Sequence, residues 1–278
     1  VGSISRMYYD EATGEIYAAF RQPGVIEHVG ALDLRQGGHR HLADIKRAML
    51  YRVSSVAYDP ATGTAFYTND NLALRDLMAV NVKTGEQRML FEDARIGEIV
   101  FNPADRSLWG VRHDNGMASL VRLPPPYDTW HRVHDFPYEH VPSDLDISPD
   151  GRLLSATMSD VTGDQYLRVW EIARLEQGDL THLSEYRFGQ SVPESFVFSA
   201  DGRYLYGSSY YTGVSNIFRY EVATGAVEAV SNAESGYFRP VPLADGQLLV
   251  LHYTSEGFVP AIIEPKPLED VSAIKFLG

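Results

Sequence analysis

The sequence predicts an all-β protein made of six similar four-stranded antiparallel sheets, and three observations lead to that prediction. A hairpin-like unit recurs six times along the 278 residues, and its tight turn returns at intervals of 43 to 51 residues. The runs beside each turn alternate apolar and polar residues, as half-buried strands do. Aromatic residues make up 12% of the chain and favour β surfaces over helices. Six such units match the blades of a six-bladed β-propeller.

The turns contain residue types that favour a tight turn of the backbone. They begin at residues 10, 59, 102, 148, 199 and 243. In the turn that starts at Asp59, Pro60 presets φ, the aspartate side chain caps the turn, and Gly63 can take the left-handed conformation. Short turns of this kind join two antiparallel strands. Each turn is therefore expected to connect the first and second strands of a blade.

The remaining two strands of each blade follow from the same alternation. In the second unit we expect them over 76–82 and 87–91, and in the fifth over 216–222 and 226–230. The only stretch that permits a helix is 172–177. A solenoid or a sandwich array is the rival fold, but a solenoid coil is shorter than this repeat. The expected blades are 3–48, 49–94, 95–138, 139–190, 191–235 and 236–278.

We expect residues 1–278 to form a single domain, because no linker or low-complexity tract separates the repeats. The chain begins with Val1 and not with Met, so we expect it to be a segment of a longer protein. The tail over 264–277 has two interpretations. It supplies the outer strand of the sixth blade, or it begins a connection to a further domain.

Composition excludes several classes of function. The net charge is −13 and the basic residues are scattered, which argues against a nucleic-acid partner. The chain has no cysteine, so disulfides, thiolate metal sites and thiol catalysis are excluded. No apolar run approaches the roughly 20 residues that span a bilayer, and we expect no membrane insertion of this segment.

Two of the turns carry a family signature. The runs 148–154 (SPDGRLL) and 199–205 (SADGRYL), with the later strand at 212–220, resemble the repeats of TolB-type WD40-like (PD40) propellers. The resemblance implies a bacterial, extracytoplasmic (periplasmic) module for protein interaction. The Trp-Asp pair of true WD40 repeats is missing, since Trp109, Trp130 and Trp170 precede Gly, His and Glu.

No motif identifies a reaction. The chain has no G-x-S-x-G elbow, no H-E-x-x-H and no G-x-G-x-x-G opening a helix, so we assign no catalytic residue and no cofactor. His39 and His41 alternate and would share one face of a strand, which suits zinc. Arg40 and Asp44 surround them, and an exposed outer strand explains them more simply. We therefore assign no metal ligand.

The remaining candidates lie where a propeller gathers the starts of its innermost strands and the loops between second and third strands. Aromatic and arginine side chains at such a rim are typical of binding hot spots. Tyr210 and Tyr211 can equally pack between blades. The nominated partner-binding residues are Arg112, His113, Tyr210, Tyr211, Arg239, His252 and Tyr253.

Three carboxylates, Glu98, Asp144 and Glu194, lie near the starts of innermost strands and form a possible cluster at the channel mouth. They can equally be solvated or paired with Arg239 or Arg52. The favoured hypothesis is a non-enzymatic module that binds a protein or peptide at one rim. The alternatives are a calcium-dependent hydrolase similar to six-bladed lactonases, which hold calcium through such oxygen ligands, and a structural spacer without a ligand.

Overall fold

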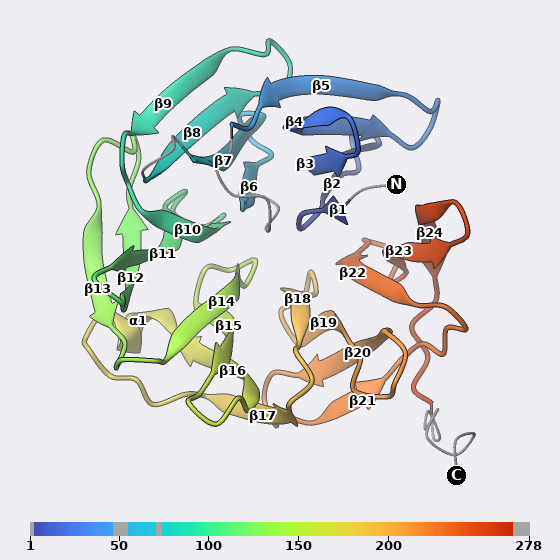
Figure 1. Cartoon of the computed structure of the whole chain (residues 1–278). Helices are drawn as coiled ribbons and strands as arrows, with labels where there is room; N and C mark the ends of the chain where they lie inside the picture. Colours follow the sequence, from blue (N-terminus) through green and yellow to red (C-terminus); the bar gives the residue numbers. More distant parts are fainter. Residues whose placement is uncertain (1–2, 47–54, 71–73, 269–278) are drawn as a thin grey trace. The chain divides into compact units, whose positions relative to one another are not determined.

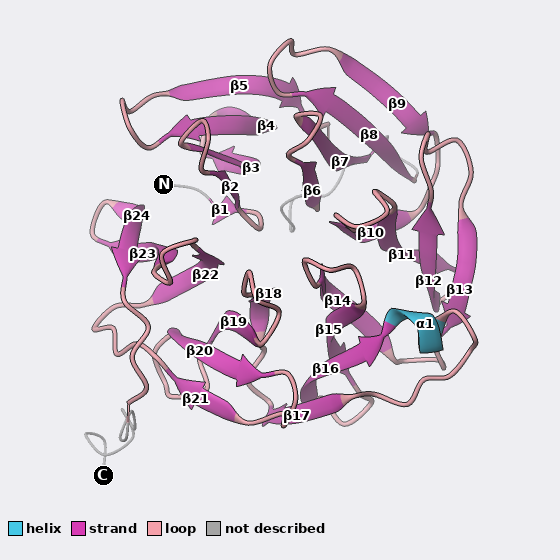
Figure 2. Ribbon diagram, turned by 180° about the vertical axis from the view of Figure 1, so that it is seen from behind, coloured by secondary structure: helices cyan, strands magenta, loops and turns pink. Residues whose placement is uncertain are grey.

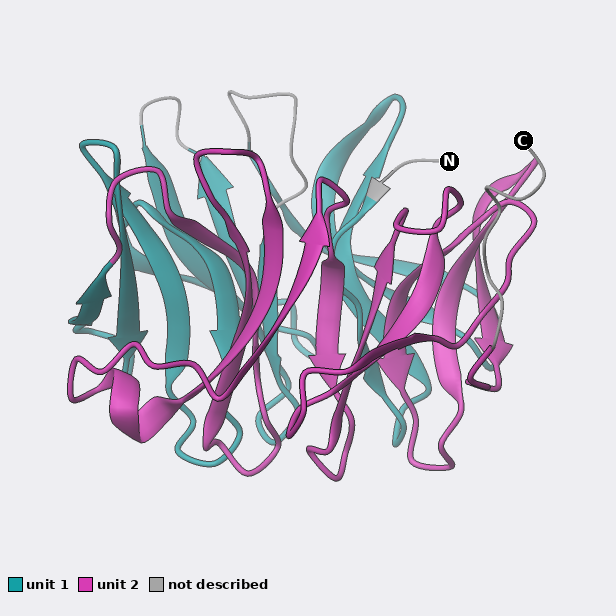
Figure 3. Cartoon of the chain, turned by 90° about the horizontal axis from the view of Figure 1, so that it is seen from below, with its two compact units in different colours: residues 1–135 teal, residues 136–278 magenta. Residues whose placement is uncertain are grey.

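A computed structural model describes residues 3–46, 55–70 and 74–268. It contains six antiparallel sheets in chain order, and the fold is a six-bladed β-propeller, as the repeats predicted (Figure 1). The chain divides into two compact units, Val1–Asp135 and Phe136–Gly278 (Figure 3), which we call the first and the second unit. Each expected blade range contains one of the six sheets.

The first unit holds three sheets. The first contains β1 (Ser3–Ile4), β2 (Tyr8–Asp10), β3 (Glu15–Gln22), β4 (Val25–Asp33) and β5 (His39–Asp44), with β1 and β2 both paired to β3. The second contains β6 (Val56–Asp59), β7 (Thr64–Asp70), β8 (Arg75–Asn81) and β9 (Gln87–Phe91). The third contains β10 (Ile96–Phe101), β11 (Leu108–Asp114), β12 (Met117–Leu123) and β13 (His131–Asp135).

The second unit holds the other three sheets. The fourth contains β14 (Val141–Ile147), β15 (Leu153–Ser159), β16 (Gln165–Glu171) and β17 (Ser184–Gly189). The fifth contains β18 (Glu194–Phe198), β19 (Tyr204–Ser209), β20 (Asn216–Glu221) and β21 (Val227–Ala229). The sixth contains β22 (Tyr237–Pro242), β23 (Leu248–Thr254) and β24 (Gly257–Ile263). In the described part of the chain there is one short helix, α1 (Ile172–Leu175), which follows β16 where the sequence permits a helix (Figure 2).

Apolar side chains of neighbouring sheets meet and form the core. Tyr17 of the first sheet and Tyr58 of the second share one buried cluster, with ring centroids 4.7 Å apart. Phe188 of the fourth sheet and Phe196 of the fifth share another buried cluster, with ring centroids 5.7 Å apart. Because a twisted four-stranded sheet cannot cover its own faces, stacking against a neighbour supplies the burial that stabilises it.

The first strands of the last four sheets share a bulge. Each pairs out of register with the second strand around one residue. At that residue the backbone is left-handed, with φ between 48° and 52°, a conformation that costs energy for any residue other than glycine. The four bulge residues are Glu98, Asp144, Ser195 and Arg239.

The sixth sheet has three strands within the described residues. The described part of the tail leaves this sheet, and the Lys266 and Leu268 amides donate hydrogen bonds to the Val230 and Ala229 carbonyls, 3.3 and 3.1 Å away. The tail therefore runs beside β21 of the fifth sheet up to residue 268. The rest of the tail, residues 269–277, lies outside the described residues, as does Arg52.

Candidate functional site: one end of the sheets in the second unit

The register of the strands brings the nominated segments of the second unit to the same end of each sheet. Val141 pairs with Ser159, Glu194 with Ser208, and Tyr237 with His252. The start of each first strand thus lies beside the loop that connects the second and third strands. We call this end, with the loops 160–164, 210–215 and 255–256, the loop end. The opposite end carries the hairpin turns at 148–151, 199–202 and 243–246, and we call it the turn end (Figure 3).

Exposed apolar side chains gather at the loop end. Of the eleven large apolar residues that are exposed in the described part of the second unit, seven lie there. Leu183 and Ile262 of that set lie near the turn end, since the Leu183 amide donates to the Val169 carbonyl near the end of β16 and Ile262 pairs with Leu249 at the start of β23. Because β14, β18 and β22 are neighbours, the seven residues belong to three adjacent sheets. They are Tyr138, Val141, Val161, Val192, Tyr210, Tyr211 and Tyr253.

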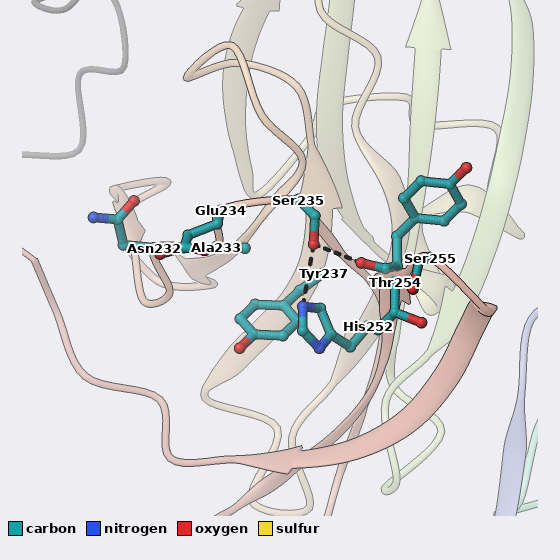
Figure 4. Close-up of a pocket in the computed structure, with 9 residues that line it drawn as sticks. Asn232, Ala233, Glu234, Ser235, Tyr237, His252, Thr254 and Ser255 are labelled. Atoms are coloured by element: carbon teal, nitrogen blue, oxygen red, sulfur yellow. Dashed lines mark hydrogen bonds between the residues drawn. The ribbon is translucent and has the colours of Figure 1, made fainter.

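An open pocket of about 610 Å³ lies at the same end (Figure 4). Its walls are the segment 232–235, Tyr237 at the start of β22, and residues 252–255 at the end of β23. The rings of Tyr237 and His252 lie 4.9 Å apart, and both line the pocket. The nominated His252 and Tyr253 both line this pocket.

A serine and a histidine also meet in this pocket, but not as a nucleophile and its base. The Ser235 hydroxyl donates its single proton to the Tyr253 carbonyl at 2.5 Å (Figure 4). The His252 Nε2, 3.2 Å from the same oxygen, must therefore be the donor in that contact. A histidine that activates a serine has to accept the hydroxyl proton. The pair consequently orders the pocket wall.

A polar centre lies where the three first strands of the second unit run side by side. The Asp144 carboxylate on β14 accepts a hydrogen bond from the Ser195 amide on β18 at 3.0 Å. The Arg239 guanidinium on β22 donates to the Ser195 hydroxyl at 3.0 Å. Three bulge residues from three sheets thus form one chain of hydrogen bonds, which fixes the strand starts relative to one another.

Glu194 lies beside this centre and differs from Asp144 electrostatically. Burial raises the pKa of Glu194, the Arg239 charge lowers it, and the Asp144 charge raises it again, with burial the largest of the three effects. Asp144 and Arg239 therefore lie close enough to Glu194 for their charges to shift its pKa. Glu98 carries the equivalent bulge in the third sheet of the first unit. Among the residues described, no three or more His, Asp or Glu side chains are arranged to hold a metal ion.

Sequence reasoning missed Ser195, although a signal for it exists. The residue four positions before the start of each hairpin turn is polar in all six repeats. At four of these positions the structure shows the left-handed bulge. At another, Ser55 accepts a hydrogen bond from the Ile99 amide of the next sheet at 2.8 Å. The six residues are Arg6, Ser55, Glu98, Asp144, Ser195 and Arg239.

The other nominated residues have partners of their own. In the first unit, the Arg112 guanidinium binds Asp114 at 2.9 Å and lies over the Trp130 ring, and the neighbouring His113 amide donates to the Arg95 carbonyl at 3.0 Å. Arg112 is thus held within its own sheet.

The two tyrosines of the 210–215 loop pack between sheets, which is one of the two interpretations considered for them, and they remain partly exposed. Tyr211 packs edge-on against Phe188 of the fourth sheet and Phe218 of the fifth, and Tyr210 packs against Phe238 of the sixth. Both contacts bridge sheets, yet Tyr210 remains 58% exposed.

The sequence matches no protein-family model and no curated protein. The fold of this chain resembles that of several solved structures. TolB from Acinetobacter baumannii is 14% identical with a TM-score of 0.55, over 94% of this chain and 66% of that chain. A puromycin hydrolase is 17% identical with a TM-score of 0.65, over 95% and 46%. An oligogalacturonate lyase in complex with manganese is 12% identical with a TM-score of 0.61, over 95% and 77%.

At these identities the similarity concerns the fold alone. The chain has the propeller fold of TolB-type proteins, as the repeat signature implied. The same fold occurs in the hydrolase and in the lyase, so the fold does not distinguish a binding module from an enzyme. This chain spans about two thirds of TolB and less than half of the puromycin hydrolase.

Proposed function

We propose that this propeller binds a protein or peptide partner through the loop end of the second unit, as a module of a larger extracytoplasmic bacterial protein. The observation that carries the proposal is the gathering of seven exposed apolar side chains at that end. Scattered apolar residues are normal on a protein surface, whereas their concentration at one site marks a surface for interaction. Tyrosine is also among the residues enriched in binding hot spots.

The charges at the loop end indicate the chemistry of the partner. Glu139, Glu234 and Glu256 are exposed there. The exposed Arg187 of the same end is already paired with Asp164. A partner segment with apolar side chains and one or two lysines or arginines would complement this surface, and opposite charges raise the rate of association.

The extracytoplasmic location rests on the resemblance to TolB-type repeats. Among the residues described, no helix is long and apolar enough to cross a membrane.

A selection from a display library of random peptides tests the proposal. The parent protein is the bait, and the variant with Tyr210→Ser and Tyr253→Ser is the counter-bait. We expect the peptides enriched on the parent to combine apolar with basic residues and to be lost on the variant. The matched control is Leu183→Ser, which removes an equally exposed apolar side chain from the turn end. Peptides that bind parent and double variant equally would place the binding surface elsewhere.

A further inference from the structure

The outer strands of the first sheet bring three histidines and an aspartate to one face. In the pairing of β4 with β5, Leu32 lies opposite His39 and Gly30 opposite His41. Side chains directly opposite one another in a sheet point to the same face. His28 of β4 lies two residues before Gly30 and therefore shares this face. None of these residues belongs to the loop end of the second unit.

A bulge adds Asp44 to the same face. The register shifts between the pairs Gly30–His41 and Val29–Ala43, so that Leu42 has no partner residue and Asp44 lies opposite His28. Strict alternation from His41 would have put Asp44 on the other face, because a one-residue insertion in a strand reverses the faces that follow. The result is a face with His28, His39, His41 and Asp44.

The nitrogens of two histidines already lie close together. The Nε2 atoms of His28 and His39 are 3.1 Å apart. His28 is 1% exposed, and its Nδ1 lies 2.8 Å from the Ile26 carbonyl, which can only accept a proton. Neutral His28 therefore carries its proton on Nδ1 and directs a bare Nε2 towards His39. Metal-binding histidines are oriented in this way, with the other ring nitrogen donating to a backbone carbonyl.

The space for the second ring depends on a glycine. A Cβ atom at position 30 would lie 2.5 Å from the His39 Nε2 and 3.0 Å from the Phe20 ring. Only glycine lets the His39 ring lie across β4 and reach His28. The His41 ring stacks on His28 with centroids 4.2 Å apart, and its Nε2 is 2.7 Å from an Asp44 carboxylate oxygen.

We propose that His28, His39 and His41 form a zinc site on this face, with Asp44 as the fourth ligand or as the partner that orients His41. Imidazole nitrogens and a carboxylate oxygen are ligands that zinc accepts in tetrahedral sites. Two nitrogens about 2.0–2.1 Å from one zinc ion are about 3.4 Å apart in that geometry. The His28 and His39 nitrogens need to separate by only a few tenths of an ångström.

The remaining rearrangement is confined to the surface. As the described side chains stand, no three donors are arranged around one point. His41 has to turn its Nε2 from Asp44 towards the ion, and both side chains are about half exposed. Zinc displaces the proton that the His39 Nε2 donates to the His28 Nε2, and that proton goes to solvent. Zinc affinity is therefore expected to fall as the pH is lowered.

The test is a zinc titration of the untagged protein in competition with a coloured chelator. We expect one equivalent of zinc to bind, and His39→Ala to raise the Kd about a hundredfold. His131→Ala is the matched control, because it removes an exposed histidine from the outermost strand of the third sheet, and it is expected to leave the Kd unchanged. His39 and His131 are both exposed, so neither variant endangers the fold.

A second readout does not depend on the chelator. Zinc that binds only the folded state raises Tm by mass action. The Tm of the parent and of His131→Ala should rise with added zinc, and the Tm of His39→Ala should not. Absence of a one-equivalent site, or equal zinc affinity in the parent and His39→Ala, overturns the proposal.

Discussion

At the turn end of the second unit, polar side chains hydrogen-bond within their own hairpins, whereas at the loop end tyrosines and valines of three sheets face solvent. The Ser148 hydroxyl donates to Asp150 at 2.6 Å and accepts from the Leu153 amide at 3.0 Å. Tyr253 at the loop end is 47% exposed and lines the pocket. A polar side chain also holds a hairpin at the loop end, where Asp160 accepts from the Thr162 amide at 2.8 Å, but the exposed apolar side chains gather mainly at that end.

Glu194 differs electrostatically from the aspartates that cap turns, including Asp160 of the loop end, whose pKa is lowered by the hydrogen bond from the Thr162 hydroxyl. The hydrogen bond from Ser148 lowers the pKa of Asp150, and the one from Ser199 lowers the pKa of Asp201. At the loop end, burial raises the pKa of Glu194. The fold stabilises the ionised aspartates of the turns and destabilises the ionised glutamate. A group that weakens the folded state is a candidate for a function other than folding.

A methyl group at Gly207 is expected to have the largest effect, because it would disturb the sheet that joins the two ends. A Cβ atom there would lie 2.1–2.5 Å from the ring atoms of the buried Phe196. We expect Gly207→Ala to lower the free energy of unfolding by about 3 kcal/mol. Urea denaturation measures it. A loss below about 1 kcal/mol would mean that Phe196 can move aside and that the sheet is less rigid than described.

Removing one tyrosine from the loop end tests the comparison directly. We expect Tyr253→Ser to weaken binding of a selected peptide by about 2 kcal/mol, which is roughly a thirtyfold rise in Kd. Fluorescence anisotropy with a labelled peptide measures it. Leu183→Ser at the turn end is expected to leave the Kd unchanged. If the two substitutions weaken binding equally, the difference between the ends has no bearing on recognition.

Removing a hydroxyl from the turn end should change the stability of the protein and leave peptide binding unchanged, unlike Tyr253→Ser. Ser148→Ala deletes one donor and one acceptor, and we expect a loss of about 1–2 kcal/mol in the free energy of unfolding at pH 7. Because the pKa of Asp150 is lowered in the fold, its contribution is present above the ordinary value of 3.8 and is lost as the pH falls through the lowered value. The difference in free energy of unfolding between the parent and Ser148→Ala should therefore become smaller as the pH falls below 3.8.

The smallest effect is expected at Glu194, and its sign is opposite to that expected for the turn aspartates Asp150 and Asp201. A raised pKa in the fold means that the folded protein binds more protons between the ordinary value of 4.5 and the raised value. Stability then falls as the pH rises through that interval. Glu194→Gln should raise Tm at pH 7, and the gain should vanish below pH 4.5. A lower Tm for this variant at pH 7 would show that Arg239 stabilises the carboxylate more than burial destabilises it.

The sequence predicted the sheets more completely than the functional site. The turns at 59–63 and 148–151 have side chains and glycines that specify a hairpin locally, so the strands beside them were predictable. The short helix at 172–175 lies in the stretch that permitted a helix but was too short to predict one. The nominations of Asp144, Glu194 and Arg239 rested on their place at strand starts. Ser195, which links Asp144 to Arg239, was missed because its signal, a polar residue four positions before each hairpin turn, is visible only when all six repeats are aligned.

By itself, the sequence determined the repeat, the turn chemistry and the alternation of the strands, because each of these is decided by residues a few positions apart. Only the tertiary structure decided which side chains meet. The bulge at Leu42 moves Asp44 to the face of the histidines, and the bulges at Asp144 and Arg239 direct both side chains to Ser195. A bulge depends on how one strand pairs with the next and on which sheets pack together, and no run of neighbouring residues contains that information.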